Sequence, residues 1–169
     1  TIGKTGITVE KNGFGALPIQ RISFDEAGAI LNRALDGGIN YIDTAFNYLH
    51  GESEKVLGKA LGDGYRDKVT IATKSPIWML KQPGDFDSLL AKQMGRLQTD
   101  HVDVYLLHCV MQGDWKNKVL PTGTVEALLK AKEDGRVGAI GFSFHDATDF
   151  FKEVIDYAPW DICQLQLNY

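Results

Sequence analysis

The chain has 169 residues, of which 44% are hydrophobic and 24% charged, and its net charge is −4. This length is enough for one domain with a substantial core, and the acidic balance excludes the broad basic surface of nucleic-acid-binding proteins. No apolar run approaches the roughly 18 residues of a membrane span. The two cysteines, Cys109 and Cys163, are too far apart for a local zinc site or a disulfide framework. We therefore expect a single domain over residues 1–169, in the reducing cytoplasm, without metal, membrane or nucleic-acid partners.

The first 13 residues carry turn signals, Thr5-Gly6 and Asn12-Gly13, on both sides of a short β-branched segment. This pattern predicts a small β-hairpin that plugs one end of a barrel; a frayed terminus is the alternative. Residues 13–18 follow as a first strand, in which two glycines would let a ligand approach the backbone.

Helix and strand patterns alternate through the rest of the chain. Ser23 and Glu26 have the spacing of a capping box, and an apolar helical repeat follows until Gly37-Gly38 ends it. Four further helices are predicted, carrying residues 56–61, 87–97, 125–131 and 146–157. Five further strands are predicted, over residues 39–43, 69–73, 102–107, 137–142 and 162–167.

The strands recur at intervals of roughly 25 to 35 residues, the length of a βαβ unit, which predicts a parallel α/β sheet. A doubly wound sheet usually carries a G-x-G-x-x-G turn after its first strand, but here Gly13-Phe14-Gly15 runs into Leu17-Pro18. We therefore predict a (β/α)8 TIM barrel of which this chain holds about the first six βα units. The edges of such an open barrel would be exposed, which favours self-association.

Ionisable residues end three successive predicted strands: Asp43, Lys74 and His108. Tyr48 lies in the loop after the first of them. Each has an ordinary explanation when taken alone, such as a turn cap, a surface lysine, a core histidine or a surface aromatic. Their coincidence is less ordinary. Because the carboxyl ends of barrel strands meet at one mouth, we expect these four side chains to converge there.

These four groups together suit proton transfer to a carbonyl. A lysine paired with Asp43 stays charged, and we expect it to lower the pKa of Tyr48 from its usual value of about 10. Such a phenol exchanges protons near neutral pH, while His108 would hydrogen-bond the carbonyl and orient it. The site has no evident serine or cysteine nucleophile. Reduction of a carbonyl also needs a hydride, which a nicotinamide cofactor supplies.

Three more residues suit that cofactor. Ser143 ends the fifth predicted strand and Gln164 lies within the sixth. Both are able to hydrogen-bond a carboxamide. Tyr169, just beyond the sixth strand, would stack against a flat ring.

Four segments of the chain resemble motifs of the aldo-keto reductases. They are residues 40–48, Gly51–Glu54, Ala72–Lys74 and Val102–His108. The resemblance implies that Asp43, Tyr48, Lys74 and His108 are a catalytic tetrad with Tyr48 as the general acid. It also implies that Ser143 and Gln164 hold the nicotinamide carboxamide. The implied cofactor is NADP(H), with NAD(H) as the alternative.

The chain also departs from that family's pattern. Family members often have asparagine after the serine that Ser143 resembles, whereas Phe144 and His145 follow here. The run from Gly141 to His145 is similar to a microbial branch that often carries a C-terminal ferredoxin-like iron–sulfur domain, whose cysteines would lie beyond Tyr169. The family's phosphate-binding loops follow its seventh and eighth strands. We therefore expect a fragment that by itself binds cofactor weakly and turns over little.

The predicted function is the reduction of aldehydes or ketones, small-molecule carbonyl substrates, to alcohols. The alternative is a nucleotide-sensing or regulatory subunit that keeps the fold with little turnover. An aldolase with a Schiff base on Lys74 is disfavoured, because Asp43 would keep that amine charged. Trp78 and Trp115 are candidate walls of a largely apolar mouth.

Overall fold

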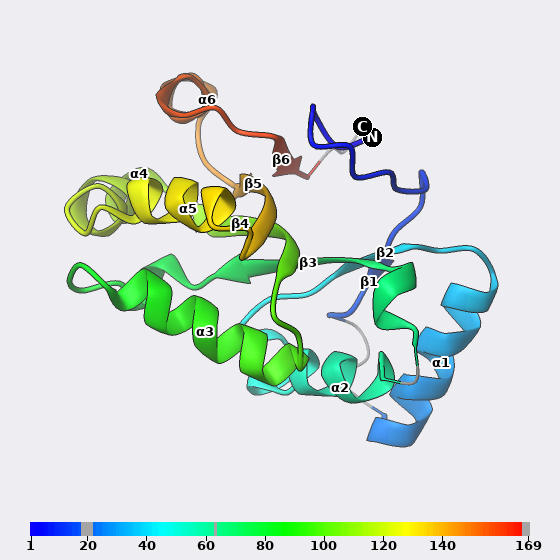
Figure 1. The fold of residues 1–169 in the computed structure, drawn as a ribbon. Helices are drawn as coiled ribbons and strands as arrows, with labels where there is room; N and C mark the ends of the chain where they lie inside the picture. Colours follow the sequence, from blue (N-terminus) through cyan, green and yellow to red (C-terminus); the bar gives the residue numbers. More distant parts are fainter. Residues whose placement is uncertain (18–21, 63, 167–169) are drawn as a thin grey trace.

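The computed structural model describes residues 1–17, 22–62 and 64–166 (Figure 1). Six strands form one parallel sheet in which each strand pairs with the next along the chain. They are β1 (Phe14–Gly15), β2 (Tyr41–Asp43), β3 (Thr70–Ser75), β4 (Val102–Val110), β5 (Val137–Phe144) and β6 (Ile162–Leu165). The sheet curls into part of a barrel, so the predicted fold, six strands of a (β/α)8 barrel, is confirmed.

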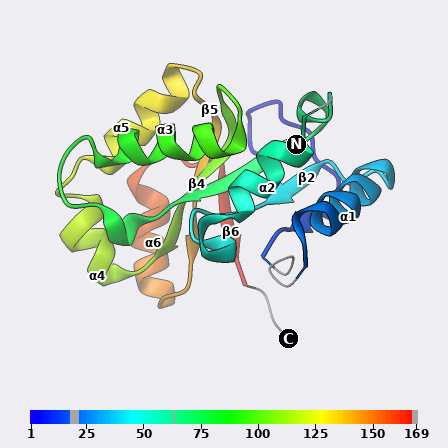
Figure 2. The same cartoon turned by 90° about the horizontal axis from the view of Figure 1, so that it is seen from below.

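The helices lie on the outer side of the curled sheet. They are α1 (Phe24–Asp36), α2 (Ser53–Ala60), α3 (Asp85–Leu97), the short α4 (Gln112–Asp114), α5 (Thr124–Glu133) and α6 (Thr148–Tyr157). Neighbours pack in order, α1 on α2, α2 on α3 and α3 on α5, and Figure 2 shows this row of helices from below. The predicted capping box is confirmed, because Ser23 and Glu26 bond each other's backbone N–H at the start of α1.

Alternation along the strands separates two cores. Outward-facing side chains pack under the helices in a large apolar cluster. A smaller apolar cluster fills the inside of the curl; it is made of Ile2, Ala72, Val104, Leu106 and Ala139. The inward-facing side chains of each strand change from apolar to polar toward the carboxyl end. The inside of the curl is therefore apolar near the amino ends of the strands and polar near their carboxyl ends.

The N-terminal segment differs from its prediction. Residues 1–13 contain a turn near Gly3, closed by the Ile2 N–H, which donates to Ile7 O at 2.8 Å; none of the thirteen residues is in a β-strand. The reason is local: Gly3 and Gly6 have φ of +48° and +80°, so the chain turns where a hairpin strand would be extended. The segment still closes the lower end of the barrel, because Ile2 is buried in the inner cluster.

Further differences concern the loops. β4 runs to Val110, beyond its predicted end, with a bulge after Leu107. A π-helix at Trp115–Val119 follows α4 where no helix was predicted. Trp115 is fully buried against Tyr157 of α6, with ring centroids 5.1 Å apart, so the prediction that it lines the mouth is wrong. It is apolar packing that holds this segment to the outer side of the sheet.

Three short 3-10 helices complete the described structure: Tyr48–Gly51, Arg66–Lys68 and Ile77–Met79. Within the described ranges, every helix is too short or too polar to cross a bilayer.

Candidate active site

The carboxyl ends of five strands deliver polar side chains to one place. Inward alternation ends in Asp43 on β2, Lys74 on β3, His108 on β4, Ser143 on β5 and Gln164 on β6. These five positions form the rim of the half-barrel. A pocket of about 280 Å³ lies among them; it is lined by Tyr48, Lys74, His108, Ser143, His145, Gln164, Leu165 and Gln166.

Lys74 is the centre of the rim and is only 2% exposed. Its Nζ donates to both carboxylate oxygens of Asp43, at 2.9 and 2.8 Å, and to Thr44 O at 2.7 Å. The hydroxyl of Tyr48 lies 3.4 Å from the same ammonium. Burial lowers the pKa of Lys74, and the charge of Asp43 opposes that shift. The pairing therefore keeps a cation where burial alone would favour a neutral amine.

The pKa of Tyr48 was expected to be lowered by Lys74, but the structure raises it. Burial, with the charge of Asp43 adding to it, raises the pKa of Tyr48 to about 12. The attraction of the lysine does not outweigh these two effects, because both oxygens of Asp43 already face the ammonium and offset part of its positive charge. Tyr48 is thus a protonated phenol at neutral pH and is held beside a cation.

His108 is a neutral imidazole that meets the Tyr48 ring edge-on, with the two ring centroids 5.8 Å apart. Burial, assisted by the charges of Lys74 and His145, lowers the pKa of His108 to about 4. The indole of Trp78 covers the same imidazole at 5.3 Å. Trp78 therefore contacts a pocket residue but is not among the residues that line the pocket, so its role as a wall of the mouth stays a prediction.

A strained backbone aims His108 into the pocket. The next residue, Cys109, has a left-handed φ of +54°, within the bulge between Leu107 and Val110. Such a conformation is uncommon outside glycine. The N–H of Cys109 donates to Ser143 Oγ at 2.7 Å, which ties β4 to β5 at this point.

Ser143 and Gln164 keep hydrogen-bonding capacity for a ligand. The hydroxyl of Ser143 accepts from Cys109, so its own hydrogen remains to donate. Gln164 Nε2 donates to Asp43 Oδ1 at 3.2 Å, whereas the buried Gln164 Oε1 has no partner among the described residues. A donor and an acceptor thus stand at neighbouring strand ends, as a primary carboxamide requires. Tyr169 lies outside the described residues.

The family model for the aldo/keto reductase family matches residues 11–169. This chain belongs to the aldo/keto reductase family. It is 33% identical over 157 residues to aldo-keto reductase YhdN of Bacillus subtilis, covering 85% of this chain and 46% of that relative. It is 32% identical over 179 residues to L-galactose dehydrogenase of Arabidopsis thaliana, covering 99% and 54%. The chain thus spans about half the length of the curated relatives it matches.

Solved aldo-keto reductases share the fold. The holo form of an enzyme from Bacillus halodurans has a TM-score of 0.82 at 26% identity, covering 99% of this chain and 56% of that one. An aldo-keto reductase from Klebsiella pneumoniae in complex with NADPH has a TM-score of 0.73 at 30% identity, covering 86% and 49%. The described residues of this aldo-keto reductase chain therefore form part of the barrel that these enzymes share.

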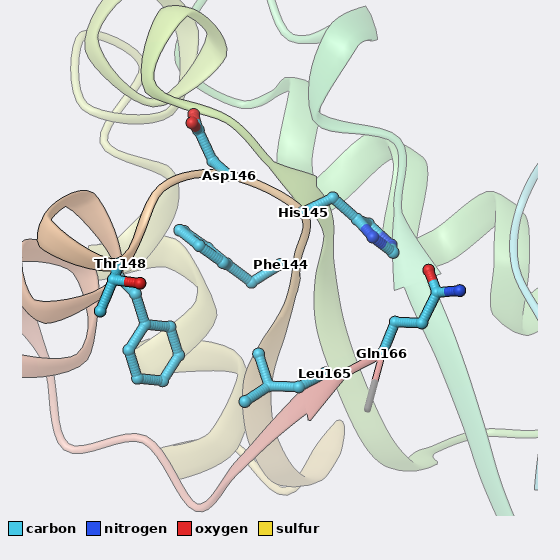
Figure 3. Close-up of a pocket in the computed structure, with 7 residues that line it drawn as sticks. Phe144, His145, Asp146, Thr148, Leu165 and Gln166 are labelled. Carbon is cyan, nitrogen blue, oxygen red and sulfur yellow. The ribbon is translucent and has the colours of Figure 1, made fainter. Parts of the chain in front are cut away.

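Three pocket residues of this aldo-keto reductase were missed in the sequence. Leu165 ends β6, and His145 and Gln166 follow the ends of β5 and β6; all three line the pocket. All three also line a neighbouring pocket of about 450 Å³, and Figure 3 shows the side chains of His145 and Gln166 turned to the same side of it. His145 and Gln166 lie two residues beyond Ser143 and Gln164, just past the ends of the same strands, and this alternate spacing was the signal that would have found them.

Proposed function

We propose that the protein containing this chain reduces aldehydes or ketones to alcohols with NADPH, and that Tyr48 is the general acid. The observation that carries the proposal is the phenol of Tyr48, which shares one pocket with His108 and lies 3.4 Å from the ammonium of Lys74. A protonated phenol beside a buried cation suits transfer of a proton to an oxygen that gains negative charge.

Tyr48 would supply that proton from its Oη. Its pKa of about 12 keeps the proton in place at neutral pH until a stronger base forms beside it. The ammonium of Lys74 then stabilises the phenolate that remains, and Asp43 holds the ammonium in position through both carboxylate oxygens. The same pairing disfavours a Schiff base on Lys74, because a charged amine is not a nucleophile.

His108 would orient the carbonyl. A neutral imidazole has one N–H to donate, and its depressed pKa keeps it neutral throughout the physiological range. Donation to the carbonyl oxygen stabilises the negative charge that develops there. The indole of Trp78 packs against the same ring and limits its movement.

The rim residues fit a nicotinamide carboxamide. The free hydrogen of Ser143 would donate to the carboxamide oxygen, and the unpartnered Gln164 Oε1 would accept from its NH2 group. When bound, such a cofactor supplies the hydride for the reduction. NADPH is favoured as the first choice by the Klebsiella structure. NADH is the alternative, because a relative with 29% identity is an NADH-specific methylglyoxal reductase of Escherichia coli.

The test uses the intact polypeptide that contains this chain. Consumption of NADPH, and separately of NADH, is followed with a panel of aldehydes and ketones for the wild type and for Tyr48→Phe. We expect the substitution to reduce kcat by about 10²- to 10⁴-fold. Cofactor affinity, measured by fluorescence titration, should stay unchanged because the phenol does not contact the carboxamide-binding residues.

Two results would contradict this proposal. Full turnover by Tyr48→Phe would remove the phenol from the reaction. Tight cofactor binding without turnover of any carbonyl compound would favour the regulatory subunit instead.

A further inference from the structure

A second buried polar cluster lies behind the rim, outside the pocket. It joins α2, β3, α3 and β4 through five side chains: Glu54, Thr73, Gln93, Arg96 and Tyr105. Four of them are fully buried, and the Arg96 side chain is 16% exposed. Since none of the five lines the pocket of about 280 Å³, the proposed reaction does not use them directly.

Glu54 is the hub of this cluster. Its Oε2 accepts from Arg96 Nη1 at 3.0 Å, and its Oε1 accepts from the Thr73 hydroxyl at 2.7 Å and from the Gln93 amide. The Tyr105 hydroxyl in turn donates to Gln93 Oε1. A carboxylate buried this completely is tolerated only when it is paired and hydrogen-bonded. Removing Arg96 would therefore leave the Glu54 carboxylate unpaired and disturb its hydrogen bonds to Thr73 and Gln93.

The cluster reaches the backbone of the rim at two points. The Gln93 amide donates to Lys74 O at 3.1 Å. Arg96 Nη1 donates to Phe46 O at 3.1 Å, and its guanidinium carbon lies over the Phe46 ring, 4.3 Å from the centroid. Phe46 is two residues before Tyr48. One arginine thus links the buried carboxylate to the loop that carries the phenol.

That loop needs an external restraint. Leu49 and His50, directly after Tyr48, have φ of +55° and +52°, and Gly51 has +93°. Two consecutive non-glycine residues in the left-handed region are strained and persist only when the surroundings hold them. A side chain at Gly51 would approach Arg96 Nη2 within 3.3 Å. The strained turn is therefore packed directly against the guanidinium.

The helix packing is built to bring the arginine there. A Cβ on Gly58 of α2 would lie 2.4 Å from the carbonyl oxygen of Arg96 on α3. Only glycine permits this approach. It sets the two helices close enough for Glu54, one turn before Gly58, to pair with Arg96.

We propose that Arg96 and Glu54 are positioning residues for Tyr48: the pair holds the Phe46–Gly51 loop so that the phenol stays beside Lys74. The inference rests on the proposed function only for its kinetic readout. The pair acts through the loop backbone and touches neither substrate nor cofactor.

Three variants of the intact polypeptide separate positioning from simple stability. Arg96→Lys keeps a cation for Glu54 but loses the planar group that bridges Glu54, Phe46 O and the Phe46 ring. Arg96→Met with Glu54→Gln removes both charges, so no buried ion is left unpaired. Arg66→Met is the matched control, because Arg66 pairs with Asp103 at 2.9 Å with similar burial, at the amino ends of the strands.

We expect both Arg96 variants to lower kcat by about 10²-fold, the cost of a small misplacement of a reacting group. The dissociation constant of the cofactor should stay unchanged. The control should lower Tm while kcat stays at the wild-type value. A kcat that recovers in the double variant together with Tm, or that falls as much in Arg66→Met, would overturn the proposal.

A second readout is independent of turnover. The Tyr48 phenol is followed by the ¹³C NMR signal of labelled tyrosine, assigned with Tyr48→Phe, during a pH titration. We expect its pKa to fall from about 12 toward the ordinary value of about 10 in both Arg96 variants, because a released loop exposes the phenol. An unchanged titration would overturn the positioning role. If the wild type turns over no carbonyl compound but the Tyr48 titration still shifts in the Arg96 variants, the positioning role stands and the proposed reaction fails.

Discussion

The two ends of the half-barrel use the same kind of ion pair for different purposes. At the amino ends of the strands, which form the base, Asp103 pairs with Arg66 and Asp161 with Lys132. Both carboxylates also accept a backbone N–H of a neighbouring strand: Ile71 N–H at 2.8 Å and Ile140 N–H at 2.9 Å. The base pairs thus fix the positions of adjacent strands.

At the rim, by contrast, the ion pair leaves neighbouring polar atoms without hydrogen-bond partners in the described structure. Lys74 is paired with Asp43 but still faces Tyr48 at 3.4 Å. Gln164 Oε1 and His108 Nδ1 are buried there without a partner among the described residues. Because buried polar atoms are normally hydrogen-bonded, these two unpaired atoms on residues that line one pocket point to a ligand; the other unpaired atoms of the described ranges, on Asn32, Ser75 and Trp115, lie on residues outside it. Under the proposed function, the charges of the base hold the strands in place and the charges of the rim serve the reaction.

The largest expected effect is at Lys74. Lys74→Met leaves Asp43 with an uncompensated buried charge, which should lower the free energy of unfolding by about 3–5 kcal/mol and abolish turnover. Adding Asp43→Asn should restore much of the stability without restoring turnover. Chemical denaturation and steady-state kinetics measure the two effects.

The control for Lys74 is Lys132→Met at the base. Its side chain is 33% exposed, and Asp161 keeps the Ile140 N–H as a donor, so the loss of stability should be smaller than at Lys74 and turnover should persist. Equal losses at Lys74 and Lys132 would break the distinction between rim and base.

The next effect is a pH dependence that comes from His108. Its folded pKa of about 4 lies below the ordinary value of 6.5, so between these values the unfolded chain binds more protons. Stability should therefore fall as the pH drops from 6.5 to 4, by about 3 kcal/mol. Denaturation of the wild type and of His108→Gln at several pH values tests this, with a flatter slope expected for the variant.

His50→Asn is the control for this slope. His50 is exposed and left-handed, and asparagine tolerates that conformation. The control should keep the wild-type slope. A slope unchanged in His108→Gln would assign the pH dependence to other groups.

The smallest effect is expected at the base. Asp161→Asn weakens the acceptor for Ile140 N–H and leaves Lys132 without its anion. The free energy of unfolding should fall by about 1–2 kcal/mol, and kcat should not change. A kcat that drops with the stability would show that the base also controls the reaction, contrary to the comparison.

Much of the rim could be predicted because strand periodicity is local. Inward positions such as Ala72 and Lys74 alternate with outward ones, so the polar residue at each strand end was identifiable before the structure. The effect of Lys74 on Tyr48 could not be predicted correctly. It depends on how both oxygens of Asp43 face the ammonium and how deeply the phenol is buried.

The sequence by itself determined the order of strands and helices, the direction of the inward side chains and the family. Only the tertiary structure decided the pairing of Glu54 with Arg96, 42 residues apart, the left-handed turn after Tyr48 and the bulge that aims His108. The reason is physical: periodicity is set by each residue and its chain neighbours, whereas these contacts depend on close approaches such as that of Gly58 to the Arg96 backbone.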